Sequence, residues 1–148
     1  MANPKDISRR RPYTVLLVAE SDESARQVEQ ALARMEMFHL IARVQSGQDA
    51  IACLKGEGRF ANRDYFPFPD IVMLDVTSDA FPVLEWLRNR TPRPVMAAFA
   101  TSDNPAIRKR IEELRADLYE PKIWEEATFQ RFIHFAGNIV EARRRERI

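Results

Sequence analysis

The feature that most constrains the fold is a short, unbroken apolar run, Ile71–Leu74, inside the stretch Pro69–Val76. An alternating pattern would leave one face of a strand in water, whereas a continuous run this short is typical of a strand covered on both faces. Such strands occur in parallel sheets with helices above and below. Two acids, Asp70 and Asp75, bound the run. Asp75 follows it and is therefore expected at the carboxyl end of the strand, where open α/β sheets place their ligand sites.

The rest of the chain alternates apolar strand-like segments with amphipathic helix-like segments. Four more segments are typical of buried strands: 14–18, 40–44, 94–100 and 117–120. Helices are expected at about 22–35, 48–54, 81–87, 103–114 and from about 125 to the basic end. The order is strand–helix five times. With right-handed crossovers, it predicts an α/β fold with a doubly wound five-stranded parallel sheet and helices on both faces.

Local signals support several of these elements. In the first helix, an apolar stripe at helical spacing consists of Ala25, Val28, Leu32 and Met35. Ser21 or Asp22 is expected to cap its start. We expect residues 1–11, which are polar and basic, to be a disordered lead-in, and residues 12–148 to form one domain. The aromatic-rich segment 57–68 is expected to be a long loop that packs onto the body or forms a binding surface.

Composition narrows the class of protein. The 148 residues are 45% hydrophobic and 30% charged with a net charge of +1, so no strong field favours nucleic acid or a membrane as partner. The basic clusters Arg9–Arg11 and Arg143–Arg145 are interpreted as solvated ends. Cys53 is the only cysteine, which argues against a disulfide framework and indicates a reducing cytoplasm. No membrane-spanning run, signal region or glycine-rich phosphate loop is recognisable.

Three landmarks in register then carry a resemblance to a known family. Acids follow the first strand in Val18-Ala-Glu-Ser-Asp22, Asp75 ends the third, and Tyr119-Glu-Pro-Lys122 ends the fifth. The chain from about Pro12 to Arg143 resembles the receiver domain of two-component response regulators. The stretch Leu54–Asn62 also resembles the long-loop, single-domain regulators found beside bacterial phytochromes. The resemblance implies the flavodoxin-like receiver fold.

The resemblance also implies roles for particular residues. Asp75 would accept a phosphoryl group from a phosphohistidine on a histidine kinase or histidine phosphotransfer protein. Glu20 and Asp75, helped by the backbone carbonyl of Thr77, would bind Mg²⁺ through hard oxygens. Lys122 would pair with the phosphoryl oxygens. The chain is not expected to be an enzyme beyond self-catalysed phosphoryl transfer and dephosphorylation.

Some positions depart from the family pattern. Ala19 occupies the first acidic place, so Mg²⁺ is expected to bind weakly. Ala100 matches the hydroxyl-bearing switch position at the end of the fourth strand, and a one-residue slip would put Thr101 there. In the family the aromatic residue, here Tyr119, turns inward when that hydroxyl binds the phosphoryl group. With Ala100 at the switch, Tyr119 would have room to lie inward without a phosphate.

Two functions therefore stay open at this point. One is a phosphoacceptor signalling switch. The other is a degenerate receiver that acts as a phosphorylation-independent interaction module. A flavodoxin-like enzyme is disfavoured, because no nucleophile–base pair is recognisable and His39 and His134 are expected to lie far from Asp75. Output is expected through a downstream protein. The fourth helix, fifth strand and fifth helix are expected to form a homodimer or partner surface, with charges from Arg108, Glu112, Glu113 and Arg115.

Overall fold

A computed structural model describes residues 11–76, 80–125 and 127–146. Its elements are β1 (Tyr13–Val18), α1 (Asp22–Ala33), β2 (Phe38–Val44), α2 (Gly47–Lys55), the 3₁₀ turn η2 (Gly58–Phe60), β3 (Ile71–Asp75), α3 (Ala80–Leu87), β4 (Val95–Phe99), α4 (Pro105–Glu113), β5 (Leu118–Glu120) and α5 (Thr128–Glu146). The five strands form one sheet in the order β2-β1-β3-β4-β5, and every pair is parallel. The predicted doubly wound α/β fold is confirmed.

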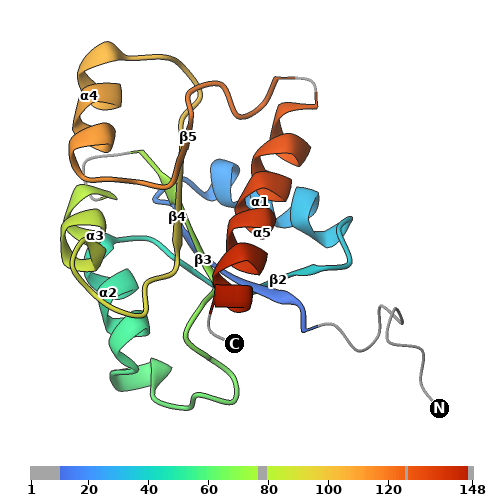
Figure 1. Cartoon of the computed structure of the whole chain (residues 1–148), viewed down its shortest axis with the longest axis vertical. Helices are drawn as coiled ribbons and strands as arrows, with labels where there is room; N and C mark the ends of the chain where they lie inside the picture. Colours follow the sequence, from blue (N-terminus) through green and yellow to red (C-terminus); the bar gives the residue numbers. More distant parts are fainter. Residues whose placement is uncertain (1–10, 77–79, 126, 147–148) are drawn as a thin grey trace.

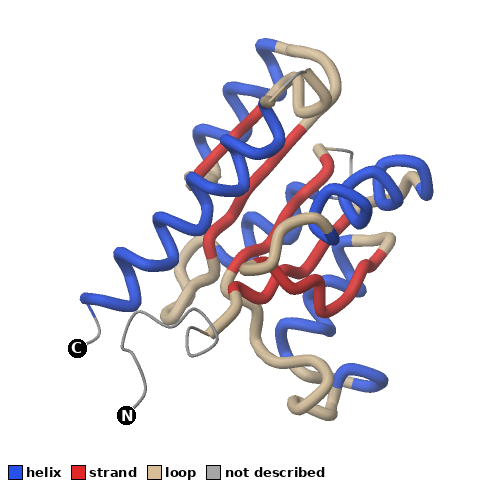
Figure 2. Tube along the Cα trace, turned by 90° about the vertical axis from the view of Figure 1, so that its right-hand side faces the viewer, coloured by secondary structure: helices blue, strands red, loops and turns tan. Residues whose placement is uncertain are grey.

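Helices cover both faces of the sheet. Figure 1 shows α2, α3 and α4 on one side of the strands and α1 and α5 on the other. Figure 2, turned so that the right-hand side of Figure 1 faces the viewer, shows the strands running side by side. Alternate residues of β3 serve the two cores: Ile71 and Met73 pack toward α1 and α5, while Val72 and Leu74 pack toward α2 and α3. Both sets are fully buried, which accounts for the unbroken apolar run in the sequence.

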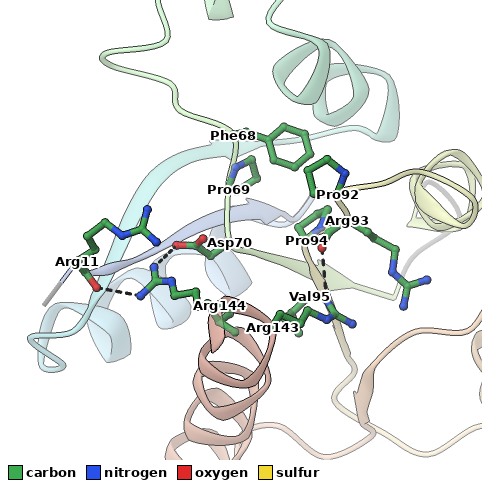
Figure 3. Close-up of a pocket in the computed structure, with 11 residues that line it drawn as sticks. Arg11, Phe68, Pro69, Asp70, Pro92, Arg93, Pro94, Val95, Arg143 and Arg144 are labelled. Atoms are coloured by element: carbon green, nitrogen blue, oxygen red, sulfur yellow. Dashed lines mark hydrogen bonds and ion pairs between the residues drawn. The ribbon is translucent and has the colours of Figure 1, made fainter. Parts of the chain in front are cut away.

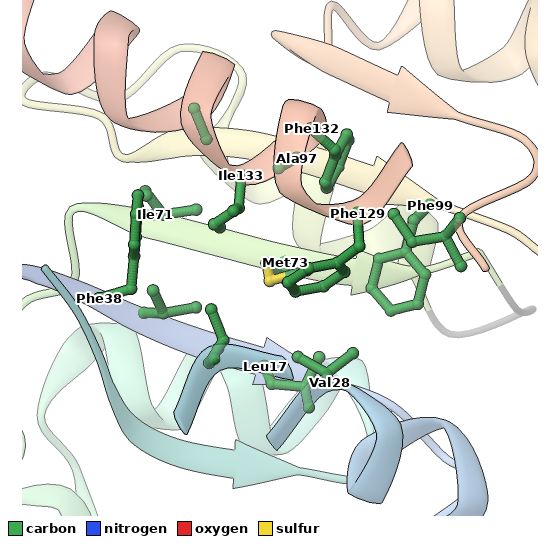
Figure 4. Packing of buried hydrophobic residues seen from close by; sticks show 14 of the residues in the cluster. Leu17, Val28, Phe38, Ile71, Met73, Ala97, Phe99, Phe129, Phe132 and Ile133 are labelled. Carbon is green, nitrogen blue, oxygen red and sulfur yellow. The ribbon is translucent and has the colours of Figure 1, made fainter. Parts of the chain in front are cut away.

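Of the five aromatic side chains that are buried in the described part of the chain, four lie in the core under α1 and α5. Figure 4 shows Phe129, Phe132 and Ile133 of α5 facing the strands, with Val28 of α1 contributing to the same cluster. The predicted stripe of α1 is confirmed, since Ala25, Val28 and Leu32 are buried and Met35 packs against them.

Several element boundaries differ from the sequence-based expectation. β2 begins at Phe38, earlier than predicted, because it pairs with β1 from Tyr13 onward. α5 begins at Thr128 rather than near residue 125. Ser21 caps α1, as predicted. Asn104 caps α4, because its side-chain oxygen accepts hydrogen bonds from two backbone N–H groups of the helix.

The long loop after α2 is fixed by one arginine. The guanidinium of Arg63 donates to the carbonyls of Cys53 and Leu54 at 2.9 and 2.7 Å, and so satisfies carbonyls at the end of α2. Gly56 ends the helix with φ 71°, and a Cβ there would lie 2.7 Å from Nε of Arg63. Phe60 is buried, whereas Tyr65 is 74% exposed. The loop thus packs onto the body and also presents aromatic surface.

At the amino-terminal edge of the sheet, Asp70 ties three segments together. Its carboxylate accepts from the backbone N–H and the hydroxyl of Thr14 at 3.0 and 3.2 Å. It also pairs with Arg144 of α5 at 3.1 Å. The expected lead-in 1–11 falls outside the described residues except for Arg11. Among the residues that are described, no helix is long and apolar enough to cross a membrane.

Candidate functional site

The candidate site lies at the carboxyl end of β3, where Asp75 is half-buried. β3 is flanked by β1 and β4. The chain runs outward from β1 to β2 and then returns to β3 on the other side of β1, so the direction of strand order reverses at β1 and β3. Crevices at such reversals are the usual ligand sites of open α/β sheets. The sheet therefore brings Asp75 to the position predicted from the sequence.

Burial raises the pKa of the Asp75 carboxyl above its ordinary value of 3.8. A side-chain hydrogen bond from Ser24 of α1 opposes this rise, while the negative charge of Glu20 adds to it. The fold thus brings Glu20 close enough to act electrostatically on Asp75, as the sequence predicted. Ser24 was not predicted as part of the site. It lies three residues after the Ser21 cap, and that spacing is the only signal that places it in the first turn of α1.

Arg43 of β2 holds the loop between β1 and α1, and sequence reasoning also missed it. Its guanidinium donates to the carbonyls of Ala19 and Glu20 at 2.9 and 3.0 Å and to the carboxylate of Asp22 at 2.8 Å. The Arg43 side chain is only 18% exposed. The two bonds to carbonyls hold the backbone that carries Glu20, and the third pairs Arg43 with Asp22.

The oxygen donors at this edge are compatible with one hard divalent cation. Mg²⁺ in proteins is commonly held by one or two carboxylates together with waters and phosphate oxygens. Glu20 and Asp75 can supply two carboxylates, whereas Ala19 is buried and Asp22 is paired with Arg43. Within the part of the chain that the structure describes, no group of three acidic, histidine or cysteine side chains gathers at one place. Thr77, the predicted carbonyl donor, lies outside the described residues.

Lys122 follows β5 at the same edge of the sheet, but its amino group is turned to another acid. Its Nζ lies 3.8 Å from a carboxylate oxygen of Glu125, and the side chain is 54% exposed. Its backbone N–H donates to the Glu120 carboxylate at 3.0 Å. The predicted role of Lys122 in pairing a phosphoryl group stays a prediction. It requires the flexible side chain to exchange Glu125 for the phosphoryl oxygens.

The register of the sheet identifies the β4 residue beside Asp75. Asp75 pairs with Phe99, and the Phe99 carbonyl accepts from the Val76 N–H at 2.8 Å. Phe99 packs into the core under α1 and α5, on the opposite face from Ala98. The extended pairing continues one residue further, since Ala100 N–H donates to the Glu120 carbonyl at 2.8 Å. Alternation therefore puts the Ala100 methyl on the Ala98 face, away from Asp75.

This register bears on the two switch positions predicted from the sequence. Ala100 is partly buried and Thr101 is exposed, and neither is paired with Asp75 in the sheet. Phe99 takes that place with a fully buried ring. The ring meets Trp124 edge-on with centroids 6.4 Å apart, and Trp124 stacks on Phe129 at 6.0 Å. The position next to Asp75 is thus filled by aromatic packing and carries no hydroxyl.

Tyr119 of β5 lies inward, on the face of the sheet opposite to the one on which Phe99 packs. Its ring packs against the core under α2, α3 and α4, and Arg108 lies 5.4 Å from the ring centroid. Its hydroxyl is buried and has no hydrogen-bond partner among the described residues. Burial, followed by the charge of Asp103, raises the pKa of the phenol. Tyr119 thus lies inward here, while the predicted link between this position and Ala100 stays a prediction.

The comparisons with known proteins give a fold rather than a sequence family. No family model matches the sequence, and no curated protein matches it. Solved structures do match. The response regulator RPA3017 of R. palustris, described in red light signaling, has a TM-score of 0.67 at 22% identity, over 88% of this chain and 90% of its own.

Two further matches belong to the same class. The phosphorylated cyanobacterial phytochrome response regulator RcpA has a TM-score of 0.67 at 23% identity, over 85% of this chain and 90% of its own. The Mn²⁺-bound form of response regulator Rcp1 has a TM-score of 0.66 at 23% identity, over 85% of this chain and 91% of its own. The resemblance to response regulators, including phytochrome-associated ones, is confirmed at the level of the fold.

Proposed function

We propose that this chain is a receiver domain of two-component signalling and accepts a phosphoryl group on Asp75. The observation that carries the proposal is the place of Asp75: a half-buried carboxylate at the carboxyl end of the central strand, beside Glu20 and at the edge that bears Lys122. The donor would be a phosphohistidine on a histidine kinase or phosphotransfer protein. We infer a cytoplasmic setting, where such donors are found.

The reaction is a direct phosphoryl transfer. A carboxylate oxygen of Asp75 attacks phosphorus, an O–P bond forms and the N–P bond of phosphohistidine breaks. The electron pair of that bond stays on the imidazole nitrogen. Catalysis of such transfers consists mainly of positioning and charge stabilisation. The Ser24 hydroxyl orients the Asp75 carboxylate, and Lys122 would balance charge on the phosphoryl oxygens after leaving Glu125.

A divalent cation fits this site through Glu20 and Asp75. When bound, it supplies neutralisation of the phosphoryl oxygens. The fit rests on two carboxylates, so weak binding is expected. The Mn²⁺ bound to Rcp1 is consistent with a hard-cation site in this fold. Arg43 limits the site further. Its guanidinium pairs with the Asp22 carboxylate at 2.8 Å, so this carboxylate is engaged and does not face a cation.

The test is intact mass after incubation with acetyl phosphate and Mg²⁺. We expect one phosphoryl adduct in the natural sequence and none in Asp75→Asn. Asp22→Asn is the matched control, because it removes a nearby carboxylate that is paired with Arg43 and is 85% exposed. It should keep the adduct. An adduct that persists in Asp75→Asn would remove the assignment.

A second candidate function is a degenerate receiver that binds partners without phosphorylation. Two observations favour it: Phe99 fills the place beside Asp75, and Tyr119 already lies inward. In that case the partner surface would be available at all times. Equal partner binding by the natural sequence and by Asp75→Asn, with and without acetyl phosphate, would support this function over the first.

The partner surface is proposed on α4, β5 and α5. The exposed part of this surface carries both signs of charge, including an ion pair of 3.2 Å between Arg108 and Asp103. Mixed charge suits a self-complementary two-fold contact between copies of the chain or a contact with a downstream protein. Sedimentation across a concentration series distinguishes the two, because only the homodimer shows mass that rises with concentration.

A further inference from the structure

A second polar site lies at the opposite edge of the sheet from Asp75. There the segment before β1, the start of β4 and the end of α5 enclose a cavity of about 250 Å³. Figure 3 shows Arg11 and Arg144 near Asp70 on one side of the cavity and Arg93 and Arg143 on the other, with Phe68 and Pro92 along one edge. The prolines that line the cavity have no backbone N–H, so polar recognition falls mainly to the guanidinium groups.

These arginines are more numerous than the acids that face them. Arg93 and Arg143 converge on a single oxygen, Oδ1 of Asp117, at 3.1 and 2.8 Å. The other oxygen, Oδ2, already accepts from the Met96 N–H at 2.8 Å. Asp117 is 12% exposed and the two arginine side chains are 22% and 28% exposed. Two cations therefore share one saturated carboxylate.

The other two arginines differ in their contacts. Arg144 pairs with Asp70 at 3.1 Å and lies 3.8 Å from Glu141, yet its buried Nε has no partner among the described residues. The side chain of Arg11 is exposed and has no hydrogen bond or ion pair within the described part of the chain. Even with Glu141 counted, four guanidinium groups face three carboxylates.

The end of a helix explains only part of this cluster. Basic side chains are favourable in the last turn of a helix because they face its negative pole, and this accounts for Arg143 and Arg144. It does not account for Arg11 and Arg93, which come from segments before β1 and β4. Arg93 and Arg143 lie close enough to share one oxygen of Asp117, so their like charges repel one another, and a bound anion would relieve that repulsion.

We propose that this cavity binds a phosphate group. Guanidinium groups match phosphate oxygens in a planar, bidentate manner, and several can bind one phosphate. The group would come from free phosphate or from a phosphomonoester of an aromatic small molecule such as a nucleoside monophosphate. Phe68 is 40% exposed at the cavity edge and also lines the adjoining hollow of about 550 Å³, which would receive the organic part.

The proposal is tested by amide NMR titration at constant ionic strength. Inorganic phosphate should shift the amides of Asp70 and Val95 in a saturable way, with a Kd of about 1 mM or tighter. The same shifts should appear in Asp75→Asn, which separates this site from the phosphoacceptor. Acetate serves as the carboxylate arm and should bind at least tenfold more weakly.

Matched variants then test the residues. Arg93→Gln and Arg11→Gln should each weaken phosphate binding at least fivefold. Arg143 still pairs with Asp117 in the first variant, and no ion pair within the described residues is lost in the second. Arg26→Gln, at an exposed position of α1, makes the same charge change and should leave binding unaltered.

The two phosphate sources are separated by AMP. Binding of AMP at least tenfold tighter than phosphate, lost in Phe68→Ala, identifies the phosphomonoester. Equal binding identifies free phosphate, and both results support the phosphate pocket. Shifts that do not saturate, that acetate reproduces equally, or that survive in both arginine variants would overturn it.

Discussion

The register of β4 leads to a prediction about the missing switch hydroxyl. Asp75 pairs with Phe99, whereas the Ala100 methyl lies on the other face of the sheet. A hydroxyl placed at Phe99 should therefore reach a phosphoryl group on Asp75, and one placed at Ala100 should not. The informative variants are Phe99→Thr and Ala100→Thr, with Phe99→Val as a control that has the shape of threonine without its hydroxyl.

The expected magnitudes separate stability from switching. Phe99 is fully buried against Trp124, so replacing it by Val or Thr should cost about 3 kcal/mol of folding free energy. A domain with a typical stability of about 5–15 kcal/mol remains folded after that loss. A hydrogen bond to a charged group contributes about 1.5–3 kcal/mol. The Thr hydroxyl should therefore shift the two-state population by about 10- to 150-fold when the phosphoryl group is present.

Beryllofluoride, a mimic of the phosphoryl group, makes the assay simple. The amide and ring signals around Tyr119 are compared with and without it in all four proteins. We expect a larger change in Phe99→Thr than in Phe99→Val, and no gain in Ala100→Thr. A gain in Ala100→Thr together with none in Phe99→Thr would refute the register argument. It would restore the position predicted from the sequence.

Three further outcomes are expected. Burial raises the pKa of Asp75, so the stability that its neutral form gives is present at low pH and is lost as pH rises through the folded-state pKa. Denaturation at pH 7 should therefore find Asp75→Asn more stable than the natural sequence. This difference in stability should close below pH 3.8, the ordinary pKa of the group. Ala19→Asp adds a carboxylate next to Glu20, and Mg²⁺ titration should show tighter binding. Arg43→Met removes three hydrogen bonds from the loop after β1, and urea unfolding should show a loss of about 1–3 kcal/mol, mostly through the two carbonyls because Asp22 is exposed.

The sequence predicted the fold because its signals are local and agree with one another. Ile71–Leu74 reads as a strand covered on both faces, and each of its residues is fully buried. The position of Asp75 followed from the same run, since an acid directly after a parallel strand has only one edge of the sheet to occupy.

The parts of the site that escaped prediction depend on pairing between distant segments. Phe99 was recognised as a strand residue, but its pairing with Asp75 depends on the register of two strands, which periodicity alone does not specify. Arg43 acts on the loop after β1 through pairing of β1 with β2. Lys122 was expected beside Asp75. Its flexible side chain can pair with any of several nearby acids, and here its amino group lies 3.8 Å from Glu125.

The net charge of +1 conceals a separation of charge between the two edges of the sheet. Parallel strands place Glu20 and Asp75 at the carboxyl edge, and the arginine-lined cavity lies at the amino edge next to Asp70. Four residues lie between Asp70 and Asp75, and the five steps along the strand from one to the other span about 16 Å. Two unit charges that far apart interact by about 1 kcal/mol at an effective dielectric constant near 20, and salt reduces this further. Occupation of the cavity should therefore leave the acidity of Asp75 nearly unchanged.

Any strong coupling between the two edges would have to travel through a change of structure. Asp70 is the residue placed to carry it, because it joins β3 to Thr14 of β1 and to Arg144 of α5.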